Sequence, residues 1–393
     1  MHSFDIIIVG GGIVGSAAAL LLAQNEDLSI GLIDSVATHP TWDPHQYDSR
    51  VSAISFASQN IFEKISVWES INNKRVSPYK KMFVWDEKGS GKIHFDCRDV
   101  QKSSLGFIIE DSLMKNSLLE IINASLNISV LSPIHLQSIN VTNDKVLLTT
   151  NNNETFSADL LIGADGANSF VREQAGIEIK TWEYHQTAIV TTVETEKSHE
   201  STAWQRFLKT GPLAFLPLED PNFSSIVWSC EPTFAKKILE LHDNDFKIQL
   251  CDAFENMLGP ILSATKRLHF PLRMRHAKNY VLPKIALVGD AAHTIHPLLG
   301  QGVNMGLADA LCLSNIINSA FKSKRDFTNI HTLRKYERER RTNNFNLLAS
   351  ADIITNLFSN DVPVASGFRN FALDFCNGIP ILKNAFAQYA MGN

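Results

Sequence analysis

Three short apolar runs in the chain each end in a glycine-rich turn, and each turn leads into a helical pattern. The runs are Phe4–Val9, Asp159–Ile162 and Ile285–Val288. Continuous apolar runs of this length are typical of strands that are buried on both faces, as in a parallel sheet. Because strands alternate with helices here, we expect an α/β fold in which the three turns converge on one ligand.

The first turn has the spacing of a dinucleotide-binding loop. Gly10, Gly12 and Gly15 form the pattern G-x-G-x-x-G between the first strand and a helical run from Ser16 to Ala23. Glycines at these positions allow a tight turn, a close approach of the pyrophosphate and close packing of the helix on the sheet. A second strand ends in Asp34, about twenty residues on, where a carboxylate can bind the ribose hydroxyls of the adenosine.

The last turn combines a carboxylate with a second glycine-rich loop. Asp290 follows the strand directly and can accept hydrogen bonds from a polyol or a ribose. Gly300 and Gly302 have no Cβ, so their backbone N–H groups can approach a ligand closely. The helix that begins near Gln301 or Gly302 has a partially positive N-terminus, which suits a ligand that is or becomes anionic. Taken alone, this loop is equally compatible with ordinary helix capping.

Between the second and third turns the pattern changes to alternating and aromatic-rich runs. Thr187–Val193, Pro212–Pro217 and Ser224–Ser229 are bounded by Gly, Pro and Asn, which predicts antiparallel strands. Lys81–Trp85 and Lys92–Phe95 predict a hairpin that joins the same sheet. This second sheet should cover the ligand and enclose a substrate pocket, since ligands commonly bind at domain junctions.

The three turns together resemble a known enzyme family. Gly10–Gly15, Gly163–Gly166 and His296–Asp309 are similar to motifs of FAD-dependent aromatic hydroxylases built like para-hydroxybenzoate hydroxylase. The segment from His296 to Asp309 resembles the signature of the ubiquinone-biosynthesis hydroxylase branch, except that Leu299 replaces a residue that is usually small. Further similar segments, such as Tyr47–Ile54, extend the resemblance over nearly the whole chain.

The resemblance implies an α/β flavoprotein of the para-hydroxybenzoate hydroxylase type. Its Rossmann-type FAD domain would be discontinuous and comprise residues 1–75, 103–178 and 270–320. Residues 76–102 and 179–269 would form an inserted antiparallel β-sheet substrate domain, and residues 321–393 a helical C-terminal region.

The resemblance also implies the reaction. A flavin C4a-hydroperoxide, formed from reduced FAD and molecular oxygen, would hydroxylate the aromatic ring of a polyprenylated phenol. The cofactor carries the chemistry, and the protein supplies orientation and excludes water. The chain has one G-x-G-x-x-G pattern and no second such unit for NAD(P)H, so electrons would come from transiently bound NAD(P)H or from a partner redox protein.

The resemblance also implies roles for individual residues. Asp165 and Arg50 resemble cofactor-contacting residues, and Pro297, Gly300 and Gln301 would shape the flavin loop where oxygen and substrate meet; no side-chain acid or base is identified. Glu110 and Gln205 are weaker candidates that we interpret first as structural. The predicted cofactor-binding residues are Gly10, Gly12, Ile13, Val14, Gly15, Asp34, Arg50, Asp165, Gly289, Asp290, Gly300, Gly302, Val303 and Asn304.

Composition narrows the class of protein. The 393 residues are 44% hydrophobic and 20% charged, which is ordinary for a globular enzyme, and the net charge of −5 gives no attraction to nucleic acid. The five cysteines are scattered without a C-x-x-C pair, which favours reduced thiols and argues against a zinc site. No metal is expected. We expect a cytoplasmic location, because the first strand begins almost at the N-terminus without a signal peptide.

Two questions stay open in the sequence. The basic segment Thr332–Arg341 is compatible with a solvated helix or with peripheral contact at the inner face of the membrane, and other ubiquinone-biosynthesis proteins or a second copy are possible partners. The alternatives to hydroxylation are another redox reaction on the same scaffold and a non-catalytic, FAD-bound member of a biosynthetic complex.

Overall fold

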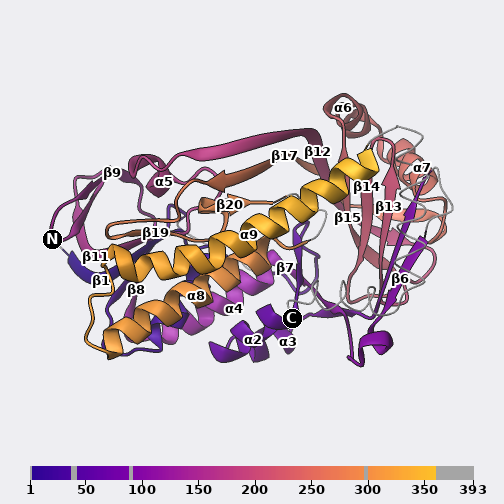
Figure 1. Cartoon of the computed structure of the whole chain (residues 1–393). Coiled ribbons are helices and arrows are strands. Elements are labelled where there is room, and N and C mark those ends of the chain that lie inside the picture. Colours follow the sequence, from indigo (N-terminus) through magenta and orange to yellow (C-terminus); the bar gives the residue numbers. More distant parts are fainter. Residues whose placement is uncertain (1, 37–41, 88–91, 296–299, 360–393) are drawn as a thin grey trace.

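The computed structural model describes residues 2–36, 42–87, 92–295 and 300–359, with side chains up to residue 349. These residues form two large sheets, a small third sheet and helices that cover them (Figure 1). The N-terminus lies at the end of the molecule that holds the first sheet, and helices α6 and α7 lie at the opposite end (Figure 1).

The first sheet has a parallel centre. Its main strands have the order β18-β19-β11-β1-β2-β8, and β1 runs parallel to β11 and β2, as β11 does to β19. The three strands that precede the glycine-rich turns are therefore neighbours, and their carboxyl ends lie at one edge, as predicted. The strands are β1 (His2–Val9), β2 (Ile30–Ile33), β8 (Ile128–Leu131), β9 (Leu136–Val141), β10 (Val146–Thr150), β11 (Thr155–Gly163), β18 (Val281–Leu282) and β19 (Ile285–Leu287).

Helices cover the first sheet and form one core with it. Helix α1 (Ile13–Ala23) is buried along most of its length because it lies against both α4 (Asp111–Ala124) and α8 (Gly302–Lys322). Its apolar run therefore serves packing on all sides. The long α9 (Ile330–Ser359) packs on α8 and β18. Two short elements complete this region, α5 (Phe170–Gln174) and η2 (Gly289–Ala291), and a third, η1 (Cys97–Val100), lies beside β6 of the second sheet.

The second sheet is mostly antiparallel and has the order β20-β17-β12-β15-β14-β13-β5-β6, with β16 beside β12. Its hairpin β5–β6 confirms the predicted one, and the three alternating runs lie in β12, β14 and β15. The strands are β5 (Lys81–Asp86), β6 (Lys92–Asp96), β12 (Ile179–Thr195), β13 (Thr202–Leu208), β14 (Gly211–Pro217), β15 (Phe223–Cys230), β16 (Ile261–Ala264), β17 (Leu268–Ala277) and β20 (His293–Thr294).

Two features of the second sheet differ from the sequence interpretation. Helices α6 (Pro232–Glu240) and α7 (Asp243–Ala253) interrupt a segment that we interpreted only as strands, and their buried residues join an aromatic-rich core on one face of the sheet. Strands β17 and β20 also extend this sheet into residues 270–320, which we assigned to the FAD domain. They do so because β12 is long enough to pair with β17 along ten positions.

A small sheet lies between the two large ones. It has the order β3-β7-β4, and its strands are antiparallel. Its strands and adjoining helices are β3 (Val51–Ile54), β4 (Ser77–Tyr79), β7 (Gly106–Glu110), α2 (Phe56–Lys64) and α3 (Trp68–Asn72). Tyr79 and Phe56 of this region pack with Met82 and Phe95 of the second sheet, so the small sheet joins the two large ones.

A buried carboxylate connects α8, α9 and the last strand–turn unit. Asp309 on α8 is fully buried, and it accepts hydrogen bonds from the Arg340 guanidinium (2.8 Å) and the Asn344 amide (3.0 Å) on α9. It also bonds the His293 imidazole and accepts from the backbone N–H of Gly289 (3.2 Å). Burial alone would raise the pKa of Asp309, but the attraction of His293 and Arg340 lowers it, so the carboxylate is ionised.

We predict that Asp309→Ala destabilises the protein by about 3–5 kcal/mol, because it leaves buried donors and a cation without their acceptor. The free energy of unfolding, measured by urea titration, tests this. The matched control is Glu26→Ala, which removes an exposed carboxylate that makes no ion pair with any described residue and should change stability by less than about 0.5 kcal/mol. A loss no larger than that of the control would show that the network does not contribute to stability.

Candidate cofactor and substrate site

The first glycine turn requires two of its glycines for backbone packing. Gly10 has φ +109°, and a Cβ there would lie 2.3 Å from the carbonyl oxygen of Ala164. A Cβ on Gly15 would lie 1.9 Å from the carbonyl oxygen of Gly10. The turns after β1 and β11 therefore contact each other directly, and α1 begins as close to β1 as the backbone allows.

Gly12 has a different role, because a Cβ there would meet no atom within 4 Å. It is the N-cap of α1 and offers no side-chain bond to the first N–H groups of the helix, which are those of Ile13, Val14 and Gly15. An open space before uncapped helix donors suits a pyrophosphate. The residues present therefore fit the diphosphate of a dinucleotide.

Asp34 lies at the end of β2 as predicted, and it supports the first turn. One carboxylate oxygen accepts from the N–H of Gly11 (2.7 Å), and the other accepts from the N–H of Val36 (2.9 Å). A Cβ on Gly11 would lie 2.6 Å from the first of these oxygens, so a side chain there would displace the Asp34 carboxylate. Each carboxylate oxygen can accept a second bond. Ribose binding by Asp34 stays a prediction.

The turn after β11 is stabilised from within. Asp165 accepts a short hydrogen bond from the Ser169 hydroxyl (2.5 Å) and another from the N–H of Val171 (3.0 Å), so it supports the strand-to-helix turn. The buried Arg172 donates to the carbonyl oxygens of Ala167 and Ala291, each at 2.9 Å. Arg172 thereby ties this turn to the turn after β19.

The turn after β19 presents the accessible carboxylate that the sequence predicts. Gly289 has φ +60° and packs against Val14 of α1, as does Gly306 of α8, where a Cβ would lie 2.5 Å from the Val14 side chain. Asp290 is exposed to solvent although protein surrounds most of it. Burial raises the pKa of the Asp290 carboxyl, and nearby His293 and Arg50 partly oppose this shift. An accessible carboxylate at this edge of the sheet is available to bind hydroxyl groups.

Arg50, directly before β3, carries an accessible cation. Its side chain is 69% exposed, and its guanidinium lies 3.6 Å from the Asp111 carboxylate, a long contact of the kind that contributes little to stability. The charge of Arg50 slightly opposes the rise in the pKa of Asp290 that burial causes. The cofactor role of Arg50 remains a prediction.

The loop before α8 is tied to the small sheet through one side chain. The Asn304 amide donates to the carbonyl oxygen of Ala53 (2.7 Å) and accepts from the N–H of Ser55 (3.0 Å) and the hydroxyl of Ser58 (2.7 Å). This side chain thus fixes the first turn of α8, whose N-cap has no side-chain bond to the first N–H groups. The backbone donors at the start of α8 remain available to an anionic edge of a ligand.

Gly300 has φ +59°, and a Cβ there would contact the Ala53 side chain at 3.0 Å, so the loop passes close to β3. Gly302 and Val303 begin α8, directly after Gln301. Pro297, which we predict to shape the side of the loop where oxygen and substrate meet, lies outside the described residues, as does Leu299, which replaces a usually small residue.

Glu110 is structural, as we interpreted it. It is buried, and its carboxylate accepts two bonds from Arg75 at 2.7 and 2.9 Å and one from the N–H of Asp48 at 2.6 Å. The guanidinium of Arg75 lies over the ring of Tyr47, 4.3 Å from its centroid. This ion pair therefore holds the segment that leads from Tyr47 to Arg50.

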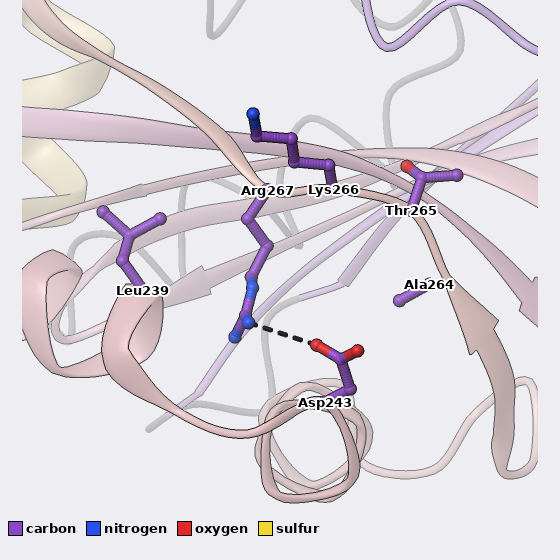
Figure 2. A pocket seen from close by; sticks show the side chains of 6 residues that line it. All are labelled: Leu239, Asp243, Ala264, Thr265, Lys266 and Arg267. Atoms are coloured by element: carbon purple, nitrogen blue, oxygen red, sulfur yellow. Dashed lines mark hydrogen bonds and ion pairs between the residues drawn. The ribbon is translucent and has the colours of Figure 1, made fainter.

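A cavity outside this site lies against α6 and α7 (Figure 2). It is lined by Leu239, Asp243, Ala264, Thr265, Lys266 and Arg267, on the side of the second sheet that α6 and α7 cover. Figure 2 shows Arg267 directed at Asp243, 3.2 Å away, and the same guanidinium donates to two backbone carbonyls. Because the Arg267 guanidinium is already bonded to protein groups, we assign no ligand to this cavity.

The described residues also bear on three wider expectations. They contain no group of three or more His, Cys, Asp or Glu side chains that could hold a metal ion. The four described cysteines are free thiols, and Cys376 lies outside the described part of the chain. Among the helices that the structure describes, none has the length and apolar character needed to cross a bilayer.

Sequence analysis missed the polar residues that hold the turns together. It assigned no role to Arg172, and Asp309 appeared only as the end of the segment that resembles the family signature. His293 and Arg340 could not be paired with Asp309 from the sequence, since Arg340 lies on a different helix. The available signal was Asp309 itself, because a charged residue in an otherwise apolar helical run indicates a buried polar contact.

Comparisons with known proteins agree with this geometry. A family model described as "FAD binding domain" matches residues 3–349. The chain is 34% identical to the 3-demethoxyubiquinol 3-hydroxylase of Escherichia coli (strain K12), over 99% of this chain and 98% of that protein. It is 33% identical to the mitochondrial ubiquinone biosynthesis monooxygenase COQ6 of Dictyostelium discoideum, over 99% of this chain and 91% of that protein.

Solved structures show the same fold. The p-nitrophenol 4-monooxygenase PnpA of Pseudomonas putida matches with a TM-score of 0.82 at 16% identity, over 100% of this chain and 99% of that one. PqsL of Pseudomonas aeruginosa, described as a probable FAD-dependent monooxygenase, matches with a TM-score of 0.78 at 17% identity, over 95% of this chain and 100% of that one. The α/β flavoprotein fold that the sequence predicts is confirmed.

We predict that Gly12→Val weakens FAD binding at least about tenfold while the apoprotein keeps its stability, because the added side chain meets only the space reserved for the pyrophosphate. Titration of apoprotein with FAD, followed by flavin fluorescence, measures the affinity, and thermal denaturation measures the stability. Gly15→Val is the contrasting variant, since its side chain would strike the backbone and lower stability as well. Unchanged FAD affinity in folded Gly12→Val protein would contradict the assignment.

Proposed function

The chain belongs to the family of proteins with this FAD-binding domain, and we propose that it is an FAD-dependent monooxygenase of ubiquinone biosynthesis. Its substrate would be a polyprenylated phenol that it hydroxylates on the aromatic ring. The observation that carries the proposal is the meeting of two uncapped helix N-termini, those of α1 and α8, with the accessible Asp290 at one edge of the first sheet.

Different residues at this edge of the sheet would bind different parts of FAD. Gly12 and the first N–H groups of α1 would hold the pyrophosphate, Asp34 the adenosine ribose, and Asp290 the ribityl hydroxyls. The start of α8 would stabilise negative charge on the flavin edge. When bound and reduced, FAD would activate molecular oxygen for transfer to the ring.

The second sheet would supply the substrate side. Its inner face, opposite α6 and α7, looks toward the small sheet, since Met82 and Phe95 on that face pack with Phe56. An apolar wall of this kind orients a hydrophobic aromatic substrate and excludes water from the reacting atoms.

Access to a lipid substrate would involve α9. Its exposed side carries Arg334, Lys335, Arg338 and Arg341, and Phe345 is 55% exposed nearby. A basic helix face with an exposed aromatic residue suits the surface of an anionic membrane. We therefore propose peripheral membrane contact through α9, and this surface is also available to other proteins of the pathway.

Ring hydroxylation is tested with reduced holoenzyme, a short-chain prenylated phenol and ¹⁸O₂, in the presence of catalase to remove free hydrogen peroxide. We expect one labelled oxygen atom in the product ring, because the inserted oxygen comes from O₂. Oxidised enzyme is the control. Flavin reoxidation without any ring product would favour another redox reaction, and stable FAD binding without reoxidation chemistry would favour a non-catalytic role.

The electron source forms a separate prediction. Because the sequence contains a single G-x-G-x-x-G pattern, we expect NADH or NADPH alone to bleach the bound FAD more slowly than about 1 s⁻¹, the low end of ordinary turnover. Stopped-flow absorbance under nitrogen, with the aromatic substrate present, measures this rate. Dithionite, which reduces accessible flavin directly, is the control. Rapid bleaching by either nucleotide would exclude an obligatory partner redox protein.

A further inference from the structure

We propose that the side-chain amide of Gln205 binds the ring oxygen of the aromatic substrate and is a positioning residue that discriminates phenols from rings without a hydroxyl. This inference rests on the function proposed above. It assigns a substrate contact to a residue that sequence analysis interpreted first as structural.

The orientation of Gln205 follows from its neighbours on β13. Arg206 donates to the carbonyl oxygen of Ala253 (2.7 Å) and pairs with Glu255 (2.7 Å), both at the end of α7, so it points to the outer face. Trp204 lies on that same face and contacts Phe254. Because side chains alternate along a strand, Gln205 points to the inner face, away from α6 and α7.

Gln205 is a largely buried residue whose amide can still be reached from the space beside the sheet. It is 7% exposed, and its amide atoms are not among the fully buried polar atoms without a hydrogen bond in the described part of the chain. Polar groups in folded proteins are usually satisfied by protein, water or ligand. An amide that small molecules can reach on an otherwise apolar face is therefore available to a ligand.

The surroundings of Gln205 are apolar. In the strand register it stands beside Val84 of β5 and Ala214 of β14, and Ala214 stands beside Val227 of β15. Val227 in turn lies opposite Val190 of β12. A single amide in a row of aliphatic side chains can bind one polar atom of a ligand that is otherwise hydrophobic, which is the chemistry of a prenylated phenol.

The inner face also looks toward the cofactor turns. Met82, which shares this face, packs with Phe56 at the start of α2, and the carbonyl of Ala53 just before it binds Asn304 of α8. At the other side of the sheet, Phe223 contacts the ring of Tyr47, in the segment that leads to Arg50. Gln205 and the aliphatic side chains in register with it therefore face the loop that would hold the flavin.

An amide suits a phenol because it can donate through its NH₂ group and accept through its oxygen. It can bind the hydroxyl of the phenol and also the oxyanion of the phenolate, which accepts from NH₂. Sites built to bond a hydroxyl discriminate strongly against an analogue without one, since the buried partner is then left unpaired.

The test compares two ligands, 2-geranylphenol and geranylbenzene, which differ by the ring hydroxyl. Their affinities for oxidised holoenzyme are measured by the change in flavin absorbance. We expect the wild-type protein to prefer the phenol by about tenfold or more, and Gln205→Met to lose that preference through weaker phenol binding with unchanged geranylbenzene binding. Methionine keeps the length of the side chain and its packing.

Gln249→Met on the exposed side of α7 is the matched control and should keep the preference. A wild-type protein that binds both ligands equally would overturn the inference without any variant, and so would a Gln205→Met protein that keeps the preference or loses affinity for both ligands alike. If the wild-type protein discriminates and Gln205→Met loses the preference, but no labelled product forms with ¹⁸O₂, the proposed hydroxylation fails and the Gln205 contact stands. If hydroxylation proceeds and the preference persists in the variant, only the Gln205 contact fails.

Discussion

The parallel pairing of β1, β11 and β19 is the constraint on which the rest of the structure depends. Because parallel neighbours end at the same edge, residues from three distant parts of the chain meet there without any long loop. The contact is close enough that side chains are excluded at Gly10 and Gly15. Backbone N–H groups and helix N-termini thereby become the main donors of the site, and a ligand with phosphates and an anionic ring suits them.

The polar groups around this edge fall into two sets. Asp165, Asn304 and Asp309 have partners in the protein, and they fix the turns and the start of α8. Asp290 and Arg50 are accessible and only weakly paired. Protein-bonded groups give a rigid frame, and accessible groups can bind a ligand without first breaking a strong bond, so preorganisation and binding are carried by different residues.

The sequence predicted the parts of the fold that depend on local order. Strand, turn and helix follow one another at Gly10 and at Asp290, and glycine spacing there reflects backbone geometry that neighbouring residues determine. The sequence did not predict α6 and α7, because the packing of their buried residues against the aromatic core of the second sheet is a tertiary contact. It also could not pair Arg340 with Asp309, since that bond depends on how α9 crosses α8, a tertiary choice that no local pattern records.

The two faces of the second sheet explain why it can serve a reaction as well as a core. The outer face is closed by α6 and α7 around Trp228, Phe215 and Phe254, so packing holds these strands in register. The inner face is then free to carry residues that packing does not require, and a buried amide such as Gln205 is tolerated there because the outer core supplies the stability. A substrate wall can vary on such a sheet while the cofactor edge stays fixed.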